Sequence, residues 1–444
     1  MTDLRPRTTL QCDVLVAGGG ATGLAAAVTA ARNGLNVVLV ERYGFCGGGA
    51  VAGLSGTICG LYEASNDETR RPVKVVHGFV DDFIAEMERR DGLGSAIRYG
   101  KTYTRVHDPI VWREAADSLL TAAGVTILYH ARVVGVLSEG GERIEGVHVD
   151  TKQGPFTIRA ALTIDATGDC DLTAMAGLET FVGDDGHVQN PTMIFRLGGV
   201  DVARFMAHYG PDTIMPLSVS ALIREANESG RYHLPRAKIW LFPTPQPGQL
   251  LCNCTRVLGP DGRELNTLIQ QDFTDAEIQG RLQMRDYAAF FKERLEGCEN
   301  SFVVDTGVQV GVRQTRQGRG RATLLNADIL SARKFSNGIA RSPWPIELHT
   351  GEKPRVEWII EDFYEVPFET FVPNAAQGLL FGGRCLSAEH EAVASARVTA
   401  QCFSYGHALG MAARLAVQDA VPSVEIDGRD VRTLLNADGA RLDG

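Results

Sequence analysis

Apolar runs and glycine-rich turns alternate in the N-terminal part of the chain. The apolar run 14–17 ends in the glycine-rich segment 18–23, and an alanine-rich segment follows as far as Gly34. A second apolar run, 36–40, closes at Glu41. Continuous apolar runs are typical of strands that are buried on both faces, and glycine commonly follows the last residue of a helix. The pattern therefore predicts a strand, a glycine turn, a helix and a second strand.

Further along, the apolar spacing changes from helical to strand-like. Residues 110–123 have the spacing of a helix, whereas short β-rich runs separated by glycine-containing turns fill about 125–160. We expect a small antiparallel meander from these runs. The apolar run 161–165 then predicts another strand, which ends at Thr167 and Gly168.

Changes in the pattern of apolar and polar residues divide the chain into three segments. Residues 1–182 form an α/β unit, whereas residues 183–371 mix strands and helices with long polar connections and suit a separate α+β domain that covers a substrate. Residues 372–444 return to the first domain, because they contain a third glycine-terminated strand at 378–383 and a helix of small residues at 398–417. The sequence thus predicts two domains, the first of them discontinuous.

Composition and charge exclude several classes of protein. The 444 residues are 44% hydrophobic and 22% charged, as in a globular protein. The formal net charge of −10 gives no indication of a basic surface that binds nucleic acid. The longest weakly polar stretch, 23–31, is far shorter than the roughly 20 residues that span a bilayer. With no signal-type segment at the N-terminus, the sequence predicts a cytoplasmic protein without a membrane span.

The glycines at 18, 20 and 23 have the spacing of a dinucleotide-binding turn. Gly18 permits the tight turn, Gly20 lets the backbone approach a pyrophosphate, and Gly23 lets helix and strand pack closely. The helix N-terminus then stabilises the phosphate charge, and Glu41 is placed to accept hydrogen bonds from an adenosine ribose. This motif by itself fits FAD and NAD equally well.

Motifs along most of the chain resemble one known family. They are the segments 14–41, 47–49, 166–169, 311–316 and 382–390. Together they resemble the FAD-dependent oxidoreductases of the glutathione-reductase-like superfamily, in a group related to fumarate reductase flavoproteins. The resemblance implies an α/β fold with two domains. The first is a Rossmann-like FAD-binding domain of the glutathione-reductase type, built as a three-layer ββα arrangement, and the second is a mixed α+β substrate domain.

The resemblance also implies which turns hold FAD. Gly47, Gly48 and Gly49 would line the pyrophosphate and flavin, and a backbone group of Val133 would contact the adenine. Arg384 stands where an acidic residue is usual in the superfamily, which implies a cationic contact to the pyrophosphate.

The helix that follows Arg397 would point its N-terminus at the flavin N1 and C2 carbonyl. Its small residues have a second explanation, which is a close crossing with another helix. The complete set expected at FAD is Gly18, Gly20, Ala21, Thr22, Gly23, Glu41, Arg42, Gly47, Gly48, Gly49, Val133, Thr167, Gly168, Gly383, Arg384, Arg397 and Val398.

Four side chains are candidates for contact with a substrate. Arg313 and Arg316 can bind a carboxylate through their planar donor groups, although both also fit a charged surface turn. By the resemblance, His349 occupies a position near the substrate face of the flavin, and His390 lies in a loop over the cofactor. The expected catalytic residues are His349, Arg313 and His390, with a structural role as the alternative for each histidine.

The nine cysteines are scattered and predict neither a disulfide framework nor a metal site. Cys252 and Cys254 fit two side chains on one strand face, because no nearby Cys or His pair completes a four-ligand site. Cys46 could approach the flavin, but the sequence lacks the second cysteine of a disulfide reductase, so a packed thiol is preferred. Covalent attachment of FAD stays open.

The expected function is hydride transfer between FAD and a small polar substrate, which can be anionic, by a dehydrogenase or a C=C reductase. An unidentified electron acceptor or donor would complete the cycle, and a homo-oligomer is compatible with the sequence. A flavin monooxygenase is one alternative, although no second glycine-triplet unit for NADPH is present. A non-catalytic flavoprotein subunit, a redox sensor and an NAD-dependent enzyme are further alternatives.

Overall fold

A seven-stranded sheet forms the centre of the computed structural model, which describes residues 9–140, 142–348 and 355–443. Strands β6, β2, β1 and β9 pair in parallel in that order, and β20 pairs in parallel with the second half of β9. The first half of β9 pairs with β8, and β8 pairs with β7, both antiparallel. The strands are β1 (Thr9–Ala17), β2 (Val37–Val40), β6 (Thr126–Leu128), β7 (Arg132–Glu139), β8 (Arg143–Asp150), β9 (Phe156–Asp165) and β20 (Leu379–Phe381).

The N-terminal elements match the sequence pattern, with one difference in the predicted meander. β1, α1 (Ala21–Arg32) and β2 follow in the predicted order, and α4 (Pro109–Ala122) matches the predicted helix. The first of the β-rich runs, β6, does not join the meander but lies parallel to β2 at the opposite edge of the sheet. Its position follows from α4, which carries the chain across the sheet and delivers β6 beside β2.

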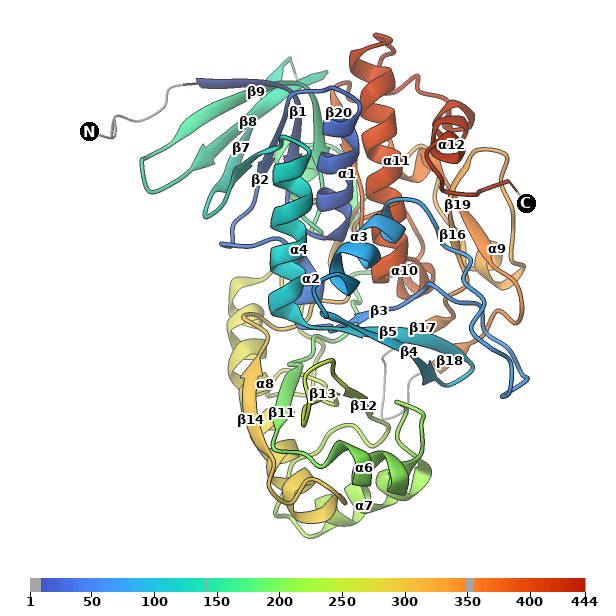
Figure 1. Ribbon diagram of the computed structural model, residues 1–444. Helices are drawn as coiled ribbons and strands as arrows, with labels where there is room; N and C mark the ends of the chain where they lie inside the picture. Colours follow the sequence, from blue (N-terminus) through green and yellow to red (C-terminus); the bar gives the residue numbers. More distant parts are fainter. Residues whose placement is uncertain (1–8, 141, 349–354, 444) are drawn as a thin grey trace.

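Helices cover one face of this sheet, and two of them cross very closely. α1 lies beside α11 (Thr399–Val417), with α4 nearby, in front of the sheet in Figure 1. A Cβ atom on Gly406 would lie 2.1 Å from the carbonyl oxygen of Thr22, and one on Gly410 would lie 2.5 Å from Cβ of Thr29. The small residues of α11 therefore serve a helix crossing, as the second explanation for them predicts.

A second sheet lies in the lower part of Figure 1 and has its own hydrophobic core. Its strands run antiparallel in the order β12, β13, β11 and β14. Cys252 lies in β13 and Cys254 directly after it, and both are buried in this core. The elements are β11 (Phe195–Gly198), β12 (Trp240–Pro243), β13 (Leu250–Asn253), β14 (Phe302–Thr306), α6 (Val202–Tyr209), α7 (Leu217–Glu228) and α8 (Gln270–Arg294).

Smaller sheets complete the fold. β3, β5 and β4 form an antiparallel sheet between the two larger sheets, and three further strand pairs are β10 with β15, β16 with β19, and β17 with β18. The strands are β3 (Thr57–Ile58), β4 (Leu93–Tyr99), β5 (Thr102–His107), β10 (Thr180–Val182), β15 (Arg316–Gly318), β16 (Gly338–Ser342), β17 (Ile346–Leu348), β18 (Arg355–Glu357) and β19 (Tyr364–Pro367). The remaining helices are α2 (Gly48–Val51), α3 (Phe79–Glu88), α5 (Asp171–Met175), α9 (Asn326–Leu330), α10 (His390–Ala396) and α12 (Gly428–Ala437), with a short 3-10 helix at Phe368–Phe371.

The two large cores draw on different parts of the chain. The core around the second sheet uses residues between Met193 and Val310, whereas residues from Leu324 to Val372 pack into the core of the first region. The boundaries at 182 and 371 themselves stay a prediction.

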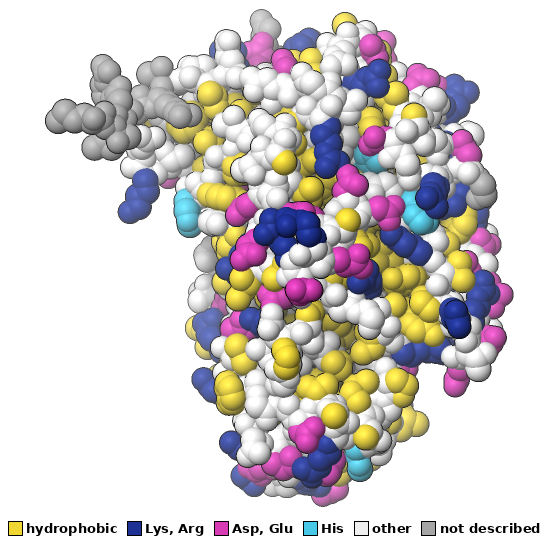
Figure 2. All heavy atoms as spheres, in the orientation of Figure 1, with side chains coloured by type: hydrophobic (Ala, Val, Ile, Leu, Met, Phe, Trp, Pro, Cys, Tyr) yellow, Lys and Arg dark blue, Asp and Glu magenta, His cyan; other side chains and the backbone are white. Residues whose placement is uncertain are grey.

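Cationic and anionic side chains are interspersed over the face drawn in Figure 2. Within the described ranges, no helix is both long enough and apolar enough to cross a bilayer.

We expect Gly406→Ala to destabilise the fold by about 1–3 kcal/mol, because its Cβ meets backbone atoms of α1 that cannot rotate away. Thermal unfolding checks this. Gly94→Ala is the control, since its Cβ would lie no closer than 3.4 Å to any atom outside its chain neighbours. Equal melting temperatures for the two variants would show that the helices separate without cost.

Candidate active site

One cavity joins the glycine turns at the edge of the first sheet to aromatic and charged side chains near the second. Turns after β1, β9 and β20 contribute Gly18, Gly168 and Gly383 to its wall. Those three parallel strands end at the same edge, which brings together segments that are far apart in the sequence. The first end of the cavity is therefore built mainly from backbone.

The turn from β1 into α1 has the geometry that its glycines predict. Gly18 has φ +98°, and a Cβ there would lie 2.4 Å from the carbonyl oxygen of Ala166. A Cβ on Gly23 would lie 1.8 Å from the oxygen of Gly18, which explains the close packing of helix and strand. At Gly20 the nearest atom to such a Cβ is 3.9 Å away, so this side of the turn is open to a ligand.

The N-terminus of α1 suits a phosphate group. No side chain caps it, and its first turn has no acidic residue. Its free N–H groups and the helix dipole therefore favour an anion beside Gly20. The residues present fit the pyrophosphate of a dinucleotide.

Glu41 is fixed at the end of β2 by two backbone donors. Its carboxylate accepts hydrogen bonds from the N–H of Gly19 at 2.7 Å and of Tyr43 at 2.9 Å. Burial raises the pKa of this carboxyl above its usual value. A carboxylate can accept further hydrogen bonds, and Glu41 lines the cavity, so it can still receive the hydroxyls of a ribose.

Arg384 also lines the cavity, but it is already paired. Its guanidinium donates to Asp169 at 2.8 Å and to the hydroxyl of Thr315 at 2.9 Å. Burial alone would raise the pKa of Asp169, but the charge of Arg384 and the hydrogen bond from Thr315 outweigh it and lower that pKa. The expected cationic contact would thus come from an arginine whose charge is largely balanced by Asp169.

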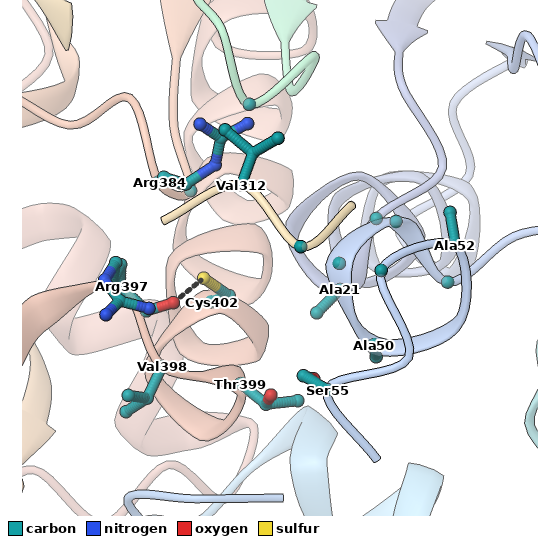
Figure 3. Close-up of a pocket in the computed structure, with 18 of the residues that line it drawn as sticks. Ala21, Ala50, Ala52, Ser55, Val312, Arg384, Arg397, Val398, Thr399 and Cys402 are labelled. Atoms are coloured by element: carbon teal, nitrogen blue, oxygen red, sulfur yellow. Dashed lines mark hydrogen bonds between the residues drawn. The ribbon is translucent and has the colours of Figure 1, made fainter. Parts of the chain in front are cut away.

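The N-terminus of α11 faces the cavity opposite the glycine turns. In Figure 3, Arg397, Val398 and Thr399 lie across an open space from Ala21 and Ala50. Val398 is the N-cap residue of α11 and makes no side-chain cap. One of its first N–H groups, that of Ala400, donates to the carbonyl of Cys59 at 3.1 Å. The dipole of the helix still places its positive end at the space.

The other end of the cavity is an aromatic and charged chamber. The hydroxyl of Tyr99 donates to the two oxygens of Glu347, at distances of 2.8 and 3.1 Å. Arg313, only 6% exposed, donates to the carbonyl of Asn190 at 2.7 Å. The side chains that define this chamber are Tyr99, Phe242, Asn253, Arg313, Trp344 and Glu347.

The structure gathers most of the predicted site residues around this cavity. Gly23 lies behind its wall, Val133 lies on β7 away from it, and His390 does not line it. Burial lowers the pKa of His390, whose Nδ1 has no partner among the described residues. Arg316 points instead to Asp171 at 2.9 Å. The predicted residues that line the cavity are Gly18, Gly20, Ala21, Thr22, Glu41, Arg42, Gly47, Gly48, Gly49, Thr167, Gly168, Arg313, Gly383, Arg384, Arg397 and Val398.

His349 lies outside the described residues, and its role stays a prediction. Tyr99 and Glu347 were not among the predicted residues, although Glu347 stands only two positions before His349. The one sequence signal for Glu347 was its place inside the apolar run 344–348. A carboxylate buried in such a run needs a polar or charged partner.

The cysteines near the cavity are poor nucleophiles. Cys46 is buried, does not line the cavity, and accepts a hydrogen bond from the hydroxyl of Tyr129 at 3.6 Å. Cys59 and Cys402 do line it, but burial raises their pKa values to about 11 and about 12. In the described parts of the chain, no three His, Cys, Asp or Glu side chains are grouped to hold a metal ion.

Comparison with known proteins identifies the class. The family model for FAD-dependent oxidoreductases matches residues 13–435, so the chain belongs to that family and its cofactor is FAD. The parallel-strand sheet is consistent with a Rossmann-like FAD-binding domain.

Individual relatives are distant. The thiamine thiazole synthase of Thermotoga maritima is 26% identical over 163 residues, which cover 36% of this chain and 59% of that enzyme. A geranylgeranyl bacteriochlorophyll reductase-like protein from Thermoplasma acidophilum is 14% identical with a TM-score of 0.51, over 97% of this chain and 82% of that one.

A second similar structure is named for a different type of reaction. The p-nitrophenol 4-monooxygenase PnpA of Pseudomonas putida is 12% identical with a TM-score of 0.50, over 98% of this chain and 88% of that one. Likeness at these identities shows the fold alone.

We expect Glu41→Ala to weaken FAD binding about tenfold to hundredfold, because the turn loses a charged acceptor that two backbone donors use. Titration of the apoprotein with FAD measures this. Glu228→Ala, an exposed helix residue far along the chain from the turns, is the control and should bind FAD as the wild type does. Equal affinity for all three proteins would exclude Glu41 from the nucleotide site.

We expect acid precipitation to release all of the FAD into the supernatant. The two thiols that line the cavity stay protonated near neutral pH, and a protonated thiol is a weak nucleophile. The visible absorption of supernatant and pellet checks this. Colour that stays in the pellet would demonstrate a covalent link.

Proposed function

We propose that the protein transfers hydride between FAD and a small polar substrate that carries an anionic group, as a dehydrogenase or a C=C reductase. When bound, FAD supplies the hydride acceptor or donor. The observation that carries this proposal is the continuity of the cavity, which includes both the glycine turns and the buried Arg313.

A buried arginine beside an open cavity lowers the stability of the fold, because its charge is removed from water. Burial, followed by the charges of Arg236 and Arg397, lowers the pKa of Arg313 well below its usual value. Among the described residues, the hydrogen bond of its second terminal nitrogen is a long one, of 3.4 Å to Asn253. An anionic substrate group would accept a hydrogen bond from that nitrogen and offset the positive charge of Arg313. This supports a role for Arg313 in substrate binding.

We further propose a glutathione-reductase type of FAD domain, formed by residues 1–182 and 372–444, with residues 183–371 covering the substrate. The antiparallel strands β7 and β8, which pair onto the first half of β9, support this arrangement. In it, the N-terminus of α11 would stabilise negative charge on the flavin. The electron partner stays undefined.

We expect Arg313→Gln to raise the substrate concentration for half-maximal flavin reduction about tenfold to hundredfold, because a charged hydrogen bond is lost. Small carboxylates are screened anaerobically by loss of absorbance near 450 nm, and the variant is then compared with the substrate found. Arg319→Gln, which removes a pairing with Glu179 outside the cavity, is the control.

Other outcomes would contradict the proposal. Flavin that is reduced only by NADPH and then consumes oxygen with an aromatic substrate would identify a monooxygenase. Uncharged substrates that reduce the wild type and Arg313→Gln equally well would remove the anionic requirement.

A further inference from the structure

Tyr99 and Glu347 form a buried, hydrogen-bonded pair in the wall of the cavity. Tyr99 ends β4 and Glu347 lies in β17, and each is 5% exposed or less. The rings of Trp344 and Phe242 lie 5.0 and 6.2 Å from the ring of Tyr99, measured between centroids. Glu347 itself has a structural role, because its charge favours the buried Arg313 and Arg397. A phenylalanine could fill the aromatic surroundings of Tyr99, so its hydroxyl is the feature that packing does not explain.

The pair has the arrangement of a proton carrier. Because the hydroxyl of Tyr99 directs its proton to Glu347, the phenol oxygen keeps lone pairs that can accept a proton from a ligand. Burial, and then the charge of Glu347, raises the pKa of Tyr99 well above its usual value, so the phenol is neutral at rest. Both residues line the cavity.

The charges around this pair favour an anion and disfavour a cation. Arg313, Arg397 and Glu347 line the cavity. The charge of Arg236 also acts on Arg313. Nε of Arg397, a residue that lines the cavity, is a buried donor without a partner among the described residues. A carboxylate would satisfy this donor, whereas an ammonium group would be repelled by the arginines.

We propose that the substrate is a small hydroxy acid, whose carboxylate is held by Arg313 and Arg397 and whose hydroxyl proton passes through Tyr99 to Glu347. This inference rests on the proposed hydride transfer and names its substrate class. A carboxylate with a neutral reacting group fits the charges of the chamber better than an amino acid does.

The reaction balances with groups already named. The substrate O–H bond breaks, its proton goes to Oη of Tyr99, and Tyr99 passes its own proton to Glu347. The C–H bond breaks with its electron pair leaving as hydride to the flavin, and the C=O bond of a keto acid forms. In the opposite direction Glu347 and Tyr99 return the proton to the carbonyl oxygen.

The first experiment tests the substrate class with the FAD-loaded protein. Glycolate, both lactates, both malates and both mandelates are mixed anaerobically with it, with the matching amino acids and simple alcohols as controls. We expect at least one hydroxy acid to reduce the flavin, and its keto acid to raise the melting temperature of the oxidised protein. Reduction by amino acids or uncharged alcohols alone would overturn the hydroxy-acid assignment and leave hydride transfer intact.

Two further results would contradict the substrate class or the proposed function. Reduced protein that transfers hydride to unsaturated acids but not to keto acids would also overturn it. If no donor of hydride other than NADPH reduces the flavin, the proposed function itself fails.

The second experiment tests the proton route with Tyr99→Phe and Glu347→Gln. We expect Tyr99→Phe to slow flavin reduction by about a hundredfold to ten-thousandfold, the range of a lost acid or base. The keto acid should still raise its melting temperature to within twofold of the wild-type shift, and the solvent deuterium isotope effect should change. Glu347→Gln should slow reduction in the same way while binding FAD.

Tyr103→Phe is the matched control, because its hydroxyl donates to the carbonyl of Arg70 at 2.9 Å and the residue does not line the cavity. It should reduce its flavin at the wild-type rate. A Tyr99→Phe protein that loses keto-acid binding and reduction rate in equal proportion would show that Tyr99 only positions the substrate. A variant with the full reduction rate would exclude the proton route.

Discussion

The site depends on the parallel pairing of β1 with β9 and of β9 with β20. This pairing places turns that start near residues 18, 166 and 382 at one edge of the sheet. The approach is so close that a single Cβ on Gly18 would overlap the carbonyl of Ala166. Backbone rather than side chains therefore forms this part of the cavity wall, and glycine is required where two turns meet.

Charge is distributed very differently on the outside and inside of the molecule. The chain as a whole carries a formal charge of −10, and positive and negative side chains are interspersed on the face seen in Figure 2. Inside the cavity, Arg313 and Arg397 lie in the wall together with Glu347, and the charge of Arg236 also acts on Arg313. Low polarity around these buried groups strengthens their fields, so the local charges matter more there than the net charge of the protein does.

The glycine turns could be predicted from sequence because their signal is local. Gly18, Gly20 and Gly23 lie within six residues, and the flanking apolar runs define the strand and the helix. Arg313 was found because glycine and a charged motif surround it, and it does line the cavity, whereas Arg316 on the same motif pairs with Asp171. Neighbouring arginines look alike in a sequence, and only the path of the backbone separates them.

The chamber was harder to predict because its members meet only in three dimensions. Tyr99 and Glu347 are separated by 248 positions, and neither stands in a motif. β6 was misassigned to the meander for a related reason, since strand pairing depends on the crossover through α4 and not on the apolar run itself.

Backbone contacts also couple the two regions that share the cavity. A Cβ on Gly53 would lie 3.1 Å from Cα of Gly311, and the N–H of Gln309 donates to the carbonyl of Ala52 at 3.1 Å. The loop after α2 is thus in direct contact with the segment that carries Arg313. Because α2 begins at Gly48, within the glycine triplet expected at FAD, the arginine is held by the same stretch of chain that lines the nucleotide cavity. The glycine loop and the segment that carries Arg313 are therefore parts of one packed unit, in which a shift of the loop would also move the arginine.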